Sequence, residues 1–361
     1  MSDQYLFNRR SFLQTATTTM AGAALGVAAT AKDSPAPVKF GEGKTTYTLD
    51  ENWGKLPAGM SFGLGCAVVV DSKDRIIVTS RSENACVVIF DRAGKILETW
   101  TKDIADRIGY NQKQYVATAH GLYWNKEGDH EFLYWTENVE GKGENRLGAR
   151  VYKTDMDGKI LYQIGNVPKE SETAQKFDFT NPTDVAVAVN GDIYVVDGYG
   201  SQLVHQFDKN FKLIKTIGGP GKKDGQFSVC HGIWISTLRK EPEIYIADRH
   251  NDRLQVFSMD LEFKRSIGNG AVRNPCCFYQ HGGQLFIPDL GARLTVLDEH
   301  DKVVTHLGDG FDARNKKEDI VGKRPDLFAF PHALALDSHG DIYVVEWVPN
   351  GRARKLKHTP A

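Results

Sequence analysis

The chain has 361 residues, with 45 lysines and arginines against 46 aspartates and glutamates. Because neither sign of charge dominates, the composition argues against the broad basic surface of proteins that bind nucleic acids or anionic membranes. Its five cysteines have no CxxC spacing, which argues against a disulfide framework and against a thiolate zinc site. We therefore expect a monomer whose partner is a small-molecule or peptide substrate.

The first 31 residues resemble a twin-arginine export signal. Asn8-Arg9-Arg10-Ser11-Phe12-Leu13 is followed by a mild apolar run from Met20 to Ala29 and by the small residues Ala29-Thr30-Ala31. These features in this order are typical of a signal that is removed after export, and an amphipathic helix with two chance arginines is the alternative. The apolar run is too short to span a bilayer, as is every later segment. We expect a mature protein from about Lys32, periplasmic or secreted and not in the membrane.

One pattern recurs six times between residues 61 and 361. Its clearest copy has strand-like segments at 182–187, 191–197, 204–208 and 213–218, with a polar Asp/Gly turn after the first and an acid at the end of the second. The other copies begin near Gly63, His120, His231, Asn274 and Pro331. Strands separated by turn residues, in units of about 40 to 60 residues, favour four-stranded blades over βαβ units.

Such blades cannot bury both of their faces alone, so six of them must close into a ring around a central channel. The sequence therefore predicts an all-β, six-bladed β-propeller over residues 61–361. The last copy runs out after Arg354-Lys355-Leu356-Lys357, while the strand-like stretch Thr45-Thr46-Tyr47-Thr48-Leu49 precedes the first copy. We expect this stretch, which lies in the N-terminal segment 32–60, to supply the missing strand and close the ring.

Alignment of the six copies places one position, just before each inner strand, in the same place on the ring. In chain order it holds Cys66, His120, Thr183, His231, Cys276 and His332. The histidines fall in alternate blades, which a six-fold ring sets about 120° apart. A lone loop histidine is usually structural, but random placement of 11 histidines rarely fills three of six equivalent positions. Three neutral imidazoles that converge on one point suit Zn²⁺ and leave its fourth tetrahedral position open.

Arg81, Tyr199 and Arg249 follow closely after the second strands of their blades. Because the second strand ends on the face where the inner strand begins, we expect these side chains to surround the metal. Two fixed cations can hold a carboxylate and favour the phenolate form of a nearby tyrosine, which would then act as a base. The alternative is that all three are rim residues in ion pairs or contacts with their neighbours.

From about Ser61 to the C-terminus, the chain resembles the peptidyl-α-hydroxyglycine α-amidating lyases, which are NHL-repeat propellers that complete C-terminal peptide amidation. The segments that carry the resemblance, in the family's order and spacing, are 182–187 (PTDVAV), 196–199 (VDGY), 226–231 (QFSVCH), 247–253 (ADRHNDR) and Pro331-His332. The resemblance implies that the zinc ligands are His120, His231 and His332. It implies that the active-site residues are Arg81, Tyr199 and Arg249.

The chain departs from the family's pattern at three kinds of position. Ala333 stands where the family has an aspartate that helps to bind a structural calcium, although the positions that contribute backbone carbonyls match Val68 and Leu122. We therefore expect calcium to bind only substoichiometrically. Phe330 replaces a methionine of the family's pocket wall. Both family disulfides are absent, because their cysteines fall on Thr180, Gly200, Tyr245 and Val256.

The resemblance implies a zinc-dependent carbon–nitrogen lyase that splits an α-hydroxyglycine-type carbinolamide into an amide and glyoxylate. Zinc would lower the pKa of the substrate hydroxyl, Tyr199 would take its proton, and the two arginines would hold the carboxylate. The chain carries no monooxygenase domain, so a separate monooxygenase would supply the hydroxylated substrate. Two alternatives stay open. One is a zinc hydrolase or lyase for a small metabolite such as ureidoglycolate, and the other is an NHL propeller that only binds.

Overall fold

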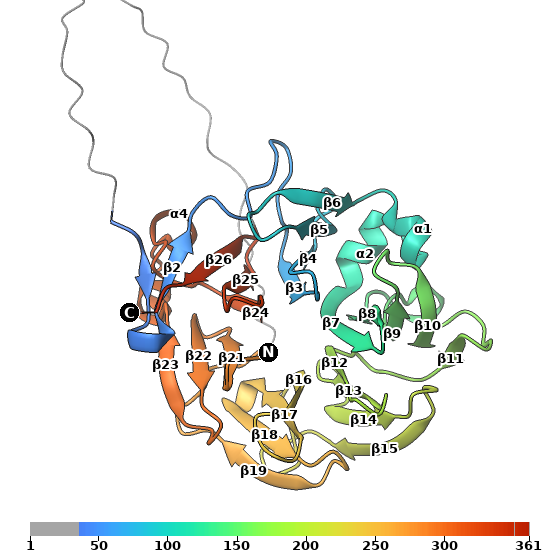
Figure 1. The fold of residues 1–361 in the computed structure, drawn as a ribbon. Coiled ribbons are helices and arrows are strands. Elements are labelled where there is room, and N and C mark those ends of the chain that lie inside the picture. The colour runs from blue at the N-terminus through green and yellow to red at the C-terminus, as the bar shows by residue number, and fades with distance from the viewer. Residues whose placement is uncertain (1–35, 350, 361) are drawn as a thin grey trace, which may run out of the picture. The chain divides into compact units, whose positions relative to one another are not determined.

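The structure is a computed structural model that describes residues 36–349 and 351–360. Its strands form six sheets, which Figure 1 shows around a common centre. The all-β, six-bladed β-propeller predicted from the repeats is confirmed, and helices occur only as short segments between strands. No helix within the described ranges is long and apolar enough to cross a membrane. The export signal predicted for residues 1–31 lies outside the described residues.

The first three blades follow one another along the chain, each running from an inner strand outward. Blade 1 consists of β3 (Gly65–Val70), β4 (Ile76–Ser80), β5 (Val87–Phe90) and β6 (Ile96–Trp100). Blade 2 consists of β7 (Ala119–Glu127), β8 (His130–Glu137), β9 (Arg150–Thr154), β10 (Ile160–Gly165) and the additional outer strand β11 (Ala174–Lys176). Blade 3 consists of β12 (Asp184–Val187), β13 (Ile193–Asp197), β14 (Leu203–Phe207) and β15 (Leu213–Gly218).

The other three blades complete the ring, and the last of them joins the two ends of the propeller. Blade 4 consists of β16 (Cys230–Ser236), β17 (Glu243–Asp248), β18 (Arg253–Phe257) and β19 (Phe263–Ile267). Blade 5 consists of β20 (Tyr279–His281), β21 (Gln284–Asp289), β22 (Arg293–Leu297) and β23 (Val303–Leu307). Blade 6 consists of β24 (Pro331–Leu336), β25 (Ile342–Glu346) and β26 (Ala353–His358), followed outward by β2 (Tyr47–Asp50) and β1 (Lys39–Phe40).

The N-terminal strand β2 closes the ring, as the sequence predicted. It pairs antiparallel with β26, so that Tyr47 lies opposite His358 and Asp50 opposite Lys355. One blade is thus built from both ends of the propeller chain. The sequence pattern missed β1 and β11, which are only two and three residues long.

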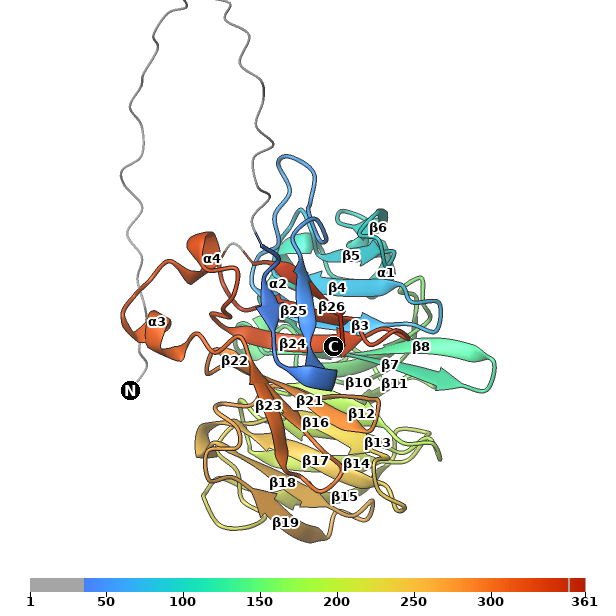
Figure 2. The same cartoon turned by 60° about the vertical axis from the view of Figure 1, so that its left-hand side comes forward.

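Short helices lie in two of the connections between blades. The connection from blade 1 to blade 2 holds α1 (Ile104–Ile108) and α2 (Gln112–Thr118), and the connection from blade 5 to blade 6 holds α3 (Phe311–Asn315) and α4 (Ile320–Lys323). Single 3-10 turns occur at Gly43–Thr45, Gly143–Asn145 and Arg249–Asn251. Figure 2 shows α3 and α4 on a loop that projects beyond the neighbouring sheets.

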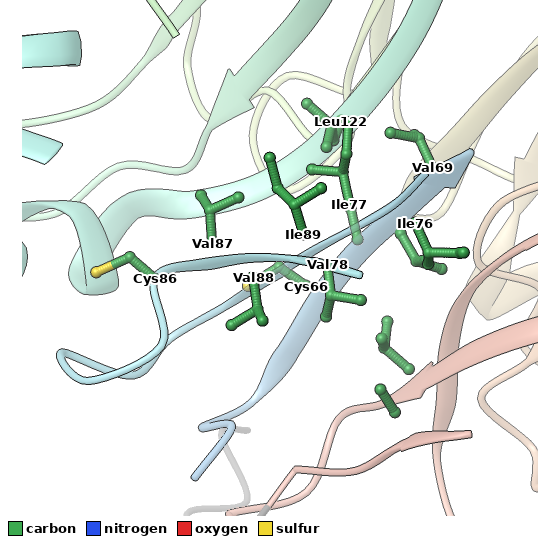
Figure 3. Packing of buried hydrophobic residues seen from close by; sticks show 14 of the residues in the cluster. Cys66, Val69, Ile76, Ile77, Val78, Cys86, Val87, Val88, Ile89 and Leu122 are labelled. Carbon is green, nitrogen blue, oxygen red and sulfur yellow. The ribbon is translucent and has the colours of Figure 1, made fainter. Parts of the chain in front are cut away.

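In blade 1 the two strands nearest the channel are buried along their whole length, because adjacent blades cover both of their faces. Every residue of β3 and β4 is buried, and most are β-branched, which suits a pleated surface. In Figure 3, Ile77 and Ile89 of blade 1 lie on the side that faces Leu122 of blade 2, and all three belong to one apolar cluster. This packing between blades holds the inner strands in register around the channel.

The polar turns of the repeat are closed by aspartate side chains. In blade 1, Oδ1 of Asp71 accepts the backbone N–H groups of Lys73 and Arg75 at 3.0 and 2.8 Å. Hydrogen bonds from an aspartate to nearby backbone groups are the reason this residue favours turns. The same pair of bonds recurs at Asp155, Asp208, Asp298 and Asp337, and Asp91 accepts one of the two, from Lys95.

Candidate metal centre

The three histidines singled out by the repeat come together at the centre of the ring. They lie on the inner strands β7, β16 and β24, and their candidate ligand atoms all lie within 4.8 Å of one another. His120, His231 and His332 are only 3%, 2% and 4% exposed. Within residues 36–349 and 351–360, this is the one group of three or more histidine, cysteine or acidic side chains arranged so that it could hold a metal.

Each histidine is oriented by the blade that follows its own. Its Nδ1 meets the backbone carbonyl of the aligned position in the next blade, which is one of the three positions without a histidine. The pairs are His120 with Thr183 at 2.7 Å, His231 with Cys276 at 2.8 Å and His332 with Cys66 at 2.7 Å. Because a carbonyl oxygen can only accept, Nδ1 must carry the proton, and Nε2 keeps a free lone pair. All three rings thus have the tautomer that binds a metal through Nε2.

The spacing of the Nε2 atoms fits a metal ion. Nε2 of His120 and Nε2 of His231 lie 3.2 Å apart, and with both protons on Nδ1 they meet lone pair to lone pair. Burial lowers the pKa of all three histidines well below the usual value, to about 3 for His332, and nearby positive charges add to the effect. The rings are therefore neutral at pH 7. Two nitrogens bound tetrahedrally to zinc at about 2.05 Å lie about 3.3 Å apart, so a cation would relieve this contact.

In two of the three blades that carry a histidine, the acid at the end of the second strand holds the segment that leads to the histidine. In blade 4, Oδ1 of Asp248 accepts the backbone N–H of Ser228 at 2.8 Å, three residues before His231. Blade 6 repeats this bond between Oε1 of Glu346 and the N–H of Ala329 at 2.7 Å, again three residues before the histidine. Asp248 and Glu346 therefore fix the segments that lead to His231 and His332.

Tyr199 and Arg249 lie against one side of the histidines. The hydroxyl oxygen of Tyr199 is 3.1 Å from Nε2 of His231, and Nη1 of Arg249 donates to the same oxygen at 2.9 Å. Tyr199 is 39% exposed, whereas Arg249 is 4% exposed. Gly198 takes the place directly after β13, because a Cβ there would lie 1.8 Å from the carbonyl oxygen of Cys230. In this blade Tyr199, the next residue, therefore supplies the side chain that reaches the histidines.

Arg81 lies on the other side of the histidines. Its Nε donates to the carbonyl oxygen of Ala119 at 3.0 Å, and its Nη2 donates to Oδ1 of Asn138 at 2.9 Å. Its guanidinium carbon lies 5.0 Å from the ring centre of Trp347. Among the residues that the structure describes, neither Arg81 nor Arg249 forms a salt bridge, whereas the buried Arg150 pairs with Glu137 at 2.6 Å. The two arginines thus keep unneutralised charge beside the centre.

The sequence analysis did not identify Asn138 and Trp347 as residues of this site. It identified Phe330 only as part of the pocket wall. Asn138 and Trp347 each follow the second strand of their blade directly, as Arg81 does, so the same alignment could have identified them. The ring of Trp347 lies 4.8 Å from the ring of His332. Phe330, expected in the pocket wall, is 36% exposed, and its carbonyl oxygen accepts the N–H of Trp347 at 2.8 Å.

The positions expected to form a calcium site line the same cavity as the three histidines. This cavity has a volume of about 250 Å³, and its lining includes Val68, Leu122 and Ala333. Asp184 is the one acidic residue in the lining. Its Oδ2 accepts the N–H of Ile233 at 3.1 Å, and burial raises the pKa of its carboxyl to about 7. Substoichiometric calcium binding stays a prediction.

Comparison with known proteins gives the same fold and a set of related sequences. Residues 170–306 match a family described as a 6-bladed beta-propeller. Over 68% of its length the chain is 26% identical to NHL repeat-containing protein 3 of Homo sapiens, and the match spans 65% of that protein, slightly less than two thirds. Over 74% of its length it is 26% identical to the probable peptidyl-alpha-hydroxyglycine alpha-amidating lyase pgal-1 of Caenorhabditis elegans, and the match spans 79% of that protein.

A solved structure supports the fold. A gluconolactonase of Xanthomonas campestris superposes with a TM-score of 0.58 at 12% sequence identity, covering 90% of this chain and 95% of that one. At this identity the likeness shows the architecture alone. The resemblance to the amidating lyases and to NHL-repeat proteins, expected from short motifs, is confirmed by matches that extend over most of the chain.

Proposed function

Since the chain is a six-bladed β-propeller related over most of its length to a protein named as an amidating lyase, we propose that it is a zinc-dependent carbon–nitrogen lyase. Its substrate would be an α-hydroxyglycine-type carbinolamide, and its products an amide and glyoxylate. The observation that carries the proposal is the contact of the Tyr199 hydroxyl with both Nε2 of His231 and Nη1 of Arg249. This contact supports the proposal because it joins a hydroxyl group, a buried cation and one of the three histidines.

The three histidines would hold the metal ion. Three neutral imidazoles with free Nε2 lone pairs are a donor set that suits zinc and leaves a coordination position open. When bound, zinc supplies the Lewis acidity that lowers the pKa of a hydroxyl group beside it. The carbonyl groups of Thr183, Cys276 and Cys66 would keep the imidazoles in the binding tautomer.

Tyr199 would move the proton of the reaction. Its hydroxyl is accessible and adjoins the centre, so as a phenolate it would take the proton from the substrate hydroxyl. As the C–O bond becomes a carbonyl, the C–N bond breaks and its electron pair goes to the nitrogen. The same proton then passes from Tyr199 to that nitrogen. The amide and glyoxylate together hold all the atoms of the substrate.

Arg81 and Arg249 would bind the substrate carboxylate. Both guanidinium groups adjoin the histidines and lack a carboxylate partner among the described residues. A carboxylate on the substrate would therefore neutralise their positive charge. Their charge would also stabilise the negative charge that develops on the oxygen as its proton leaves. Arg249 would act from the side of Tyr199, and Arg81 from the side of Trp347.

The test is an assay of glyoxylate release by the zinc-loaded protein. Three substrates separate the alternatives: a peptide ending in α-hydroxyglycine, N-benzoyl-α-hydroxyglycine and ureidoglycolate. We expect release from the first two, and loss of release after treatment with a chelator and its recovery with zinc. Release from ureidoglycolate alone would assign a small metabolite as the substrate. No release from any of the three, with zinc bound, would contradict the lyase proposal.

A further inference from the structure

The residue directly after the second strand has the same place in every blade, at the mouth of the channel. In chain order this place holds Arg81, Asn138, Gly198, Arg249, Leu290 and Trp347. Blades 6, 1 and 2 are neighbours in the ring, so Trp347, Arg81 and Asn138 stand next to one another. Their side chains are in contact, with Arg81 between the other two.

Asn138 holds one side of the Arg81 guanidinium. Its Oδ1 accepts the hydrogen bond from Nη2 of Arg81 at 2.9 Å, while its own Nδ2 donates to the carbonyl oxygen of Pro182 at 2.9 Å. The second bond fixes the amide with its oxygen toward the arginine. Asn138 is only 7% exposed, so the position of this oxygen is well defined.

Trp347 contacts the guanidinium group of Arg81 on its other side. The guanidinium carbon of Arg81 lies 5.0 Å from the centre of the Trp347 ring, a cation–π contact. The same indole packs 4.8 Å from the ring of His332, and Nε of Arg81 is bonded to the carbonyl of Ala119, the residue before His120. The guanidinium is therefore tied to the residues next to two of the three histidines.

Neither neighbour neutralises the charge of Arg81. A carboxylate lies only one residue away from Asn138, but this residue, Glu137, is paired with Arg150. Nη1 of Arg81 has no hydrogen-bond partner within the described ranges. An arginine held by an amide and an indole keeps its full positive charge and one free donor group, which is the arrangement that a carboxylate ligand requires.

We propose that Asn138 and Trp347 are positioning residues that hold Arg81 beside the metal centre without neutralising it, so that the substrate carboxylate becomes its counter-ion. The inference rests on the proposed function and assigns the residues that keep Arg81 available to the substrate carboxylate. The substrate must carry a carboxylate on the carbon that bears the hydroxyl group. A carbinolamide with an uncharged group at that carbon would leave Arg81 unpaired and would be a poor substrate.

The test combines binding with kinetics. Glyoxylate is titrated into the zinc-loaded protein in a calorimeter, and kcat and KM are measured for N-benzoyl-α-hydroxyglycine and for its carboxamide, in which the carboxylate is a neutral amide. Asn138→Asp supplies Arg81 with a competing carboxylate, so we expect the glyoxylate Kd and the KM of the acid to rise at least tenfold. The KM of the carboxamide should change less than threefold, because it has no carboxylate to compete for Arg81.

Trp347 is tested through its coupling to Arg81. A cation–π contact of about 1 kcal/mol predicts a roughly fivefold weaker glyoxylate binding in Trp347→Leu, with partial recovery in Trp347→Phe. In an Arg81→Gln background, Trp347→Leu should have no further effect on binding. The matched control is Trp124→Leu, which changes another half-buried tryptophan four residues beyond His120 on β7 and should leave glyoxylate binding unchanged. Melting temperatures exclude unfolding as the cause.

The outcomes separate this inference from the proposed function. Wild-type protein that does not bind glyoxylate, or an Asn138→Asp protein that binds it as tightly as wild type, would overturn the inference. Additive effects of Trp347→Leu and Arg81→Gln would also overturn the role assigned to Trp347. If the expected binding changes occur but neither benzoyl substrate is cleaved, the positioning of Arg81 stands and the lyase proposal fails.

Discussion

Nη1 of Arg249 donates a hydrogen bond to the hydroxyl oxygen of Tyr199 across 2.9 Å. The arginine is buried and the tyrosine is partly exposed, so the pair joins a cation fixed within the ring to a group that a ligand can reach. The other contact of the same hydroxyl, with His231, brings this pair to the candidate metal centre.

The first prediction concerns the hydroxyl of Tyr199. Tyr199→Phe removes one oxygen and hardly changes the volume of the side chain. If Tyr199 is the base, zinc content and melting temperature should stay near wild type while kcat falls by about a hundredfold or more. The measurement is glyoxylate formation at matched zinc loading. Full activity in this variant would show that Tyr199 serves only as packing.

Substitution of Arg249 should change the stability and the activity of the protein in opposite directions. Its buried guanidinium has no carboxylate partner among the described residues, and its Nε has no hydrogen-bond partner there. A buried unpaired charge is costly, so Arg249→Met should raise the free energy of unfolding by about 1 kcal/mol. Turnover should fall at least a hundredfold because the carboxylate loses one cation. Urea unfolding and the glyoxylate assay test the two effects, and a destabilised variant would contradict the first.

Metal content tests the histidine centre directly. Purified mature protein should contain about one zinc per chain, and His231→Ala should lower the occupancy at least tenfold because one of three ligands is lost. His205→Ala is the control, since that histidine bonds Thr216 within blade 3 and faces no metal ligand. Elemental analysis gives the metal content of both variants. Active protein without a stoichiometric transition metal would refute the assignment.

The ion pairs of Glu243 within blade 4 predict a specific dependence of stability on pH. Burial raises the pKa of Glu243, but its bonds with Arg265 and Lys264 outweigh burial and lower the pKa to about 2. A carboxyl whose pKa is lowered by folding stabilises the protein above its unfolded pKa of about 4.3 and loses this contribution as the pH falls toward 2. Glu243→Gln should therefore cost about 2 kcal/mol at pH 7 and progressively less below pH 4.

The control for this effect is Glu262→Gln. Glu262 also pairs with a lysine, Lys215, but it is largely exposed, with 73% of its side chain accessible. An exposed pair contributes little to stability, so this variant should unfold close to wild type at both pH values. Urea unfolding at pH 7 and pH 3 measures the difference. Equal losses of unfolding free energy in the two variants would contradict the larger contribution assigned to the buried Glu243.

Export can be tested without any knowledge of the reaction. Arg9→Lys combined with Arg10→Lys keeps the charge of the proposed signal but removes the arginine pair that twin-arginine export recognises. We expect the precursor to accumulate in the cytoplasm, as measured by fractionation and immunoblotting. Periplasmic appearance of the double variant at the wild-type level would contradict the proposal.

The local repeat was enough to predict the ring and the convergence of the histidines. Strand, turn and terminal acid recur within each copy, so aligning the copies placed His120, His231 and His332 at equivalent positions before any contact was known. The same alignment places Asn138 and Trp347 at positions equivalent to that of Arg81. It does not show that both side chains contact Arg81 across a blade boundary, because side-chain contacts between blades leave no periodic trace in the sequence.

The helical connections were also beyond sequence reasoning. Helices α1 to α4 are four to seven residues long, too short to show the apolar periodicity of a longer amphipathic helix. Their stability comes from tertiary contacts. Tyr115 of α2, for example, is buried in the same cluster as Ile104 of α1 and the inner residues of blade 1.

The pairing of β2 with β26 has a consequence for the order of events during biosynthesis. Blade 6 holds His332, and this blade is complete only when the last strand of the chain meets a strand made some 300 residues earlier, as the opposition of Tyr47 and His358 shows. A nascent chain in which β26 has not yet been made therefore lacks the completed blade that holds His332. The proposed binding of zinc by the three histidines would reach its full affinity only after β26 has paired with β2.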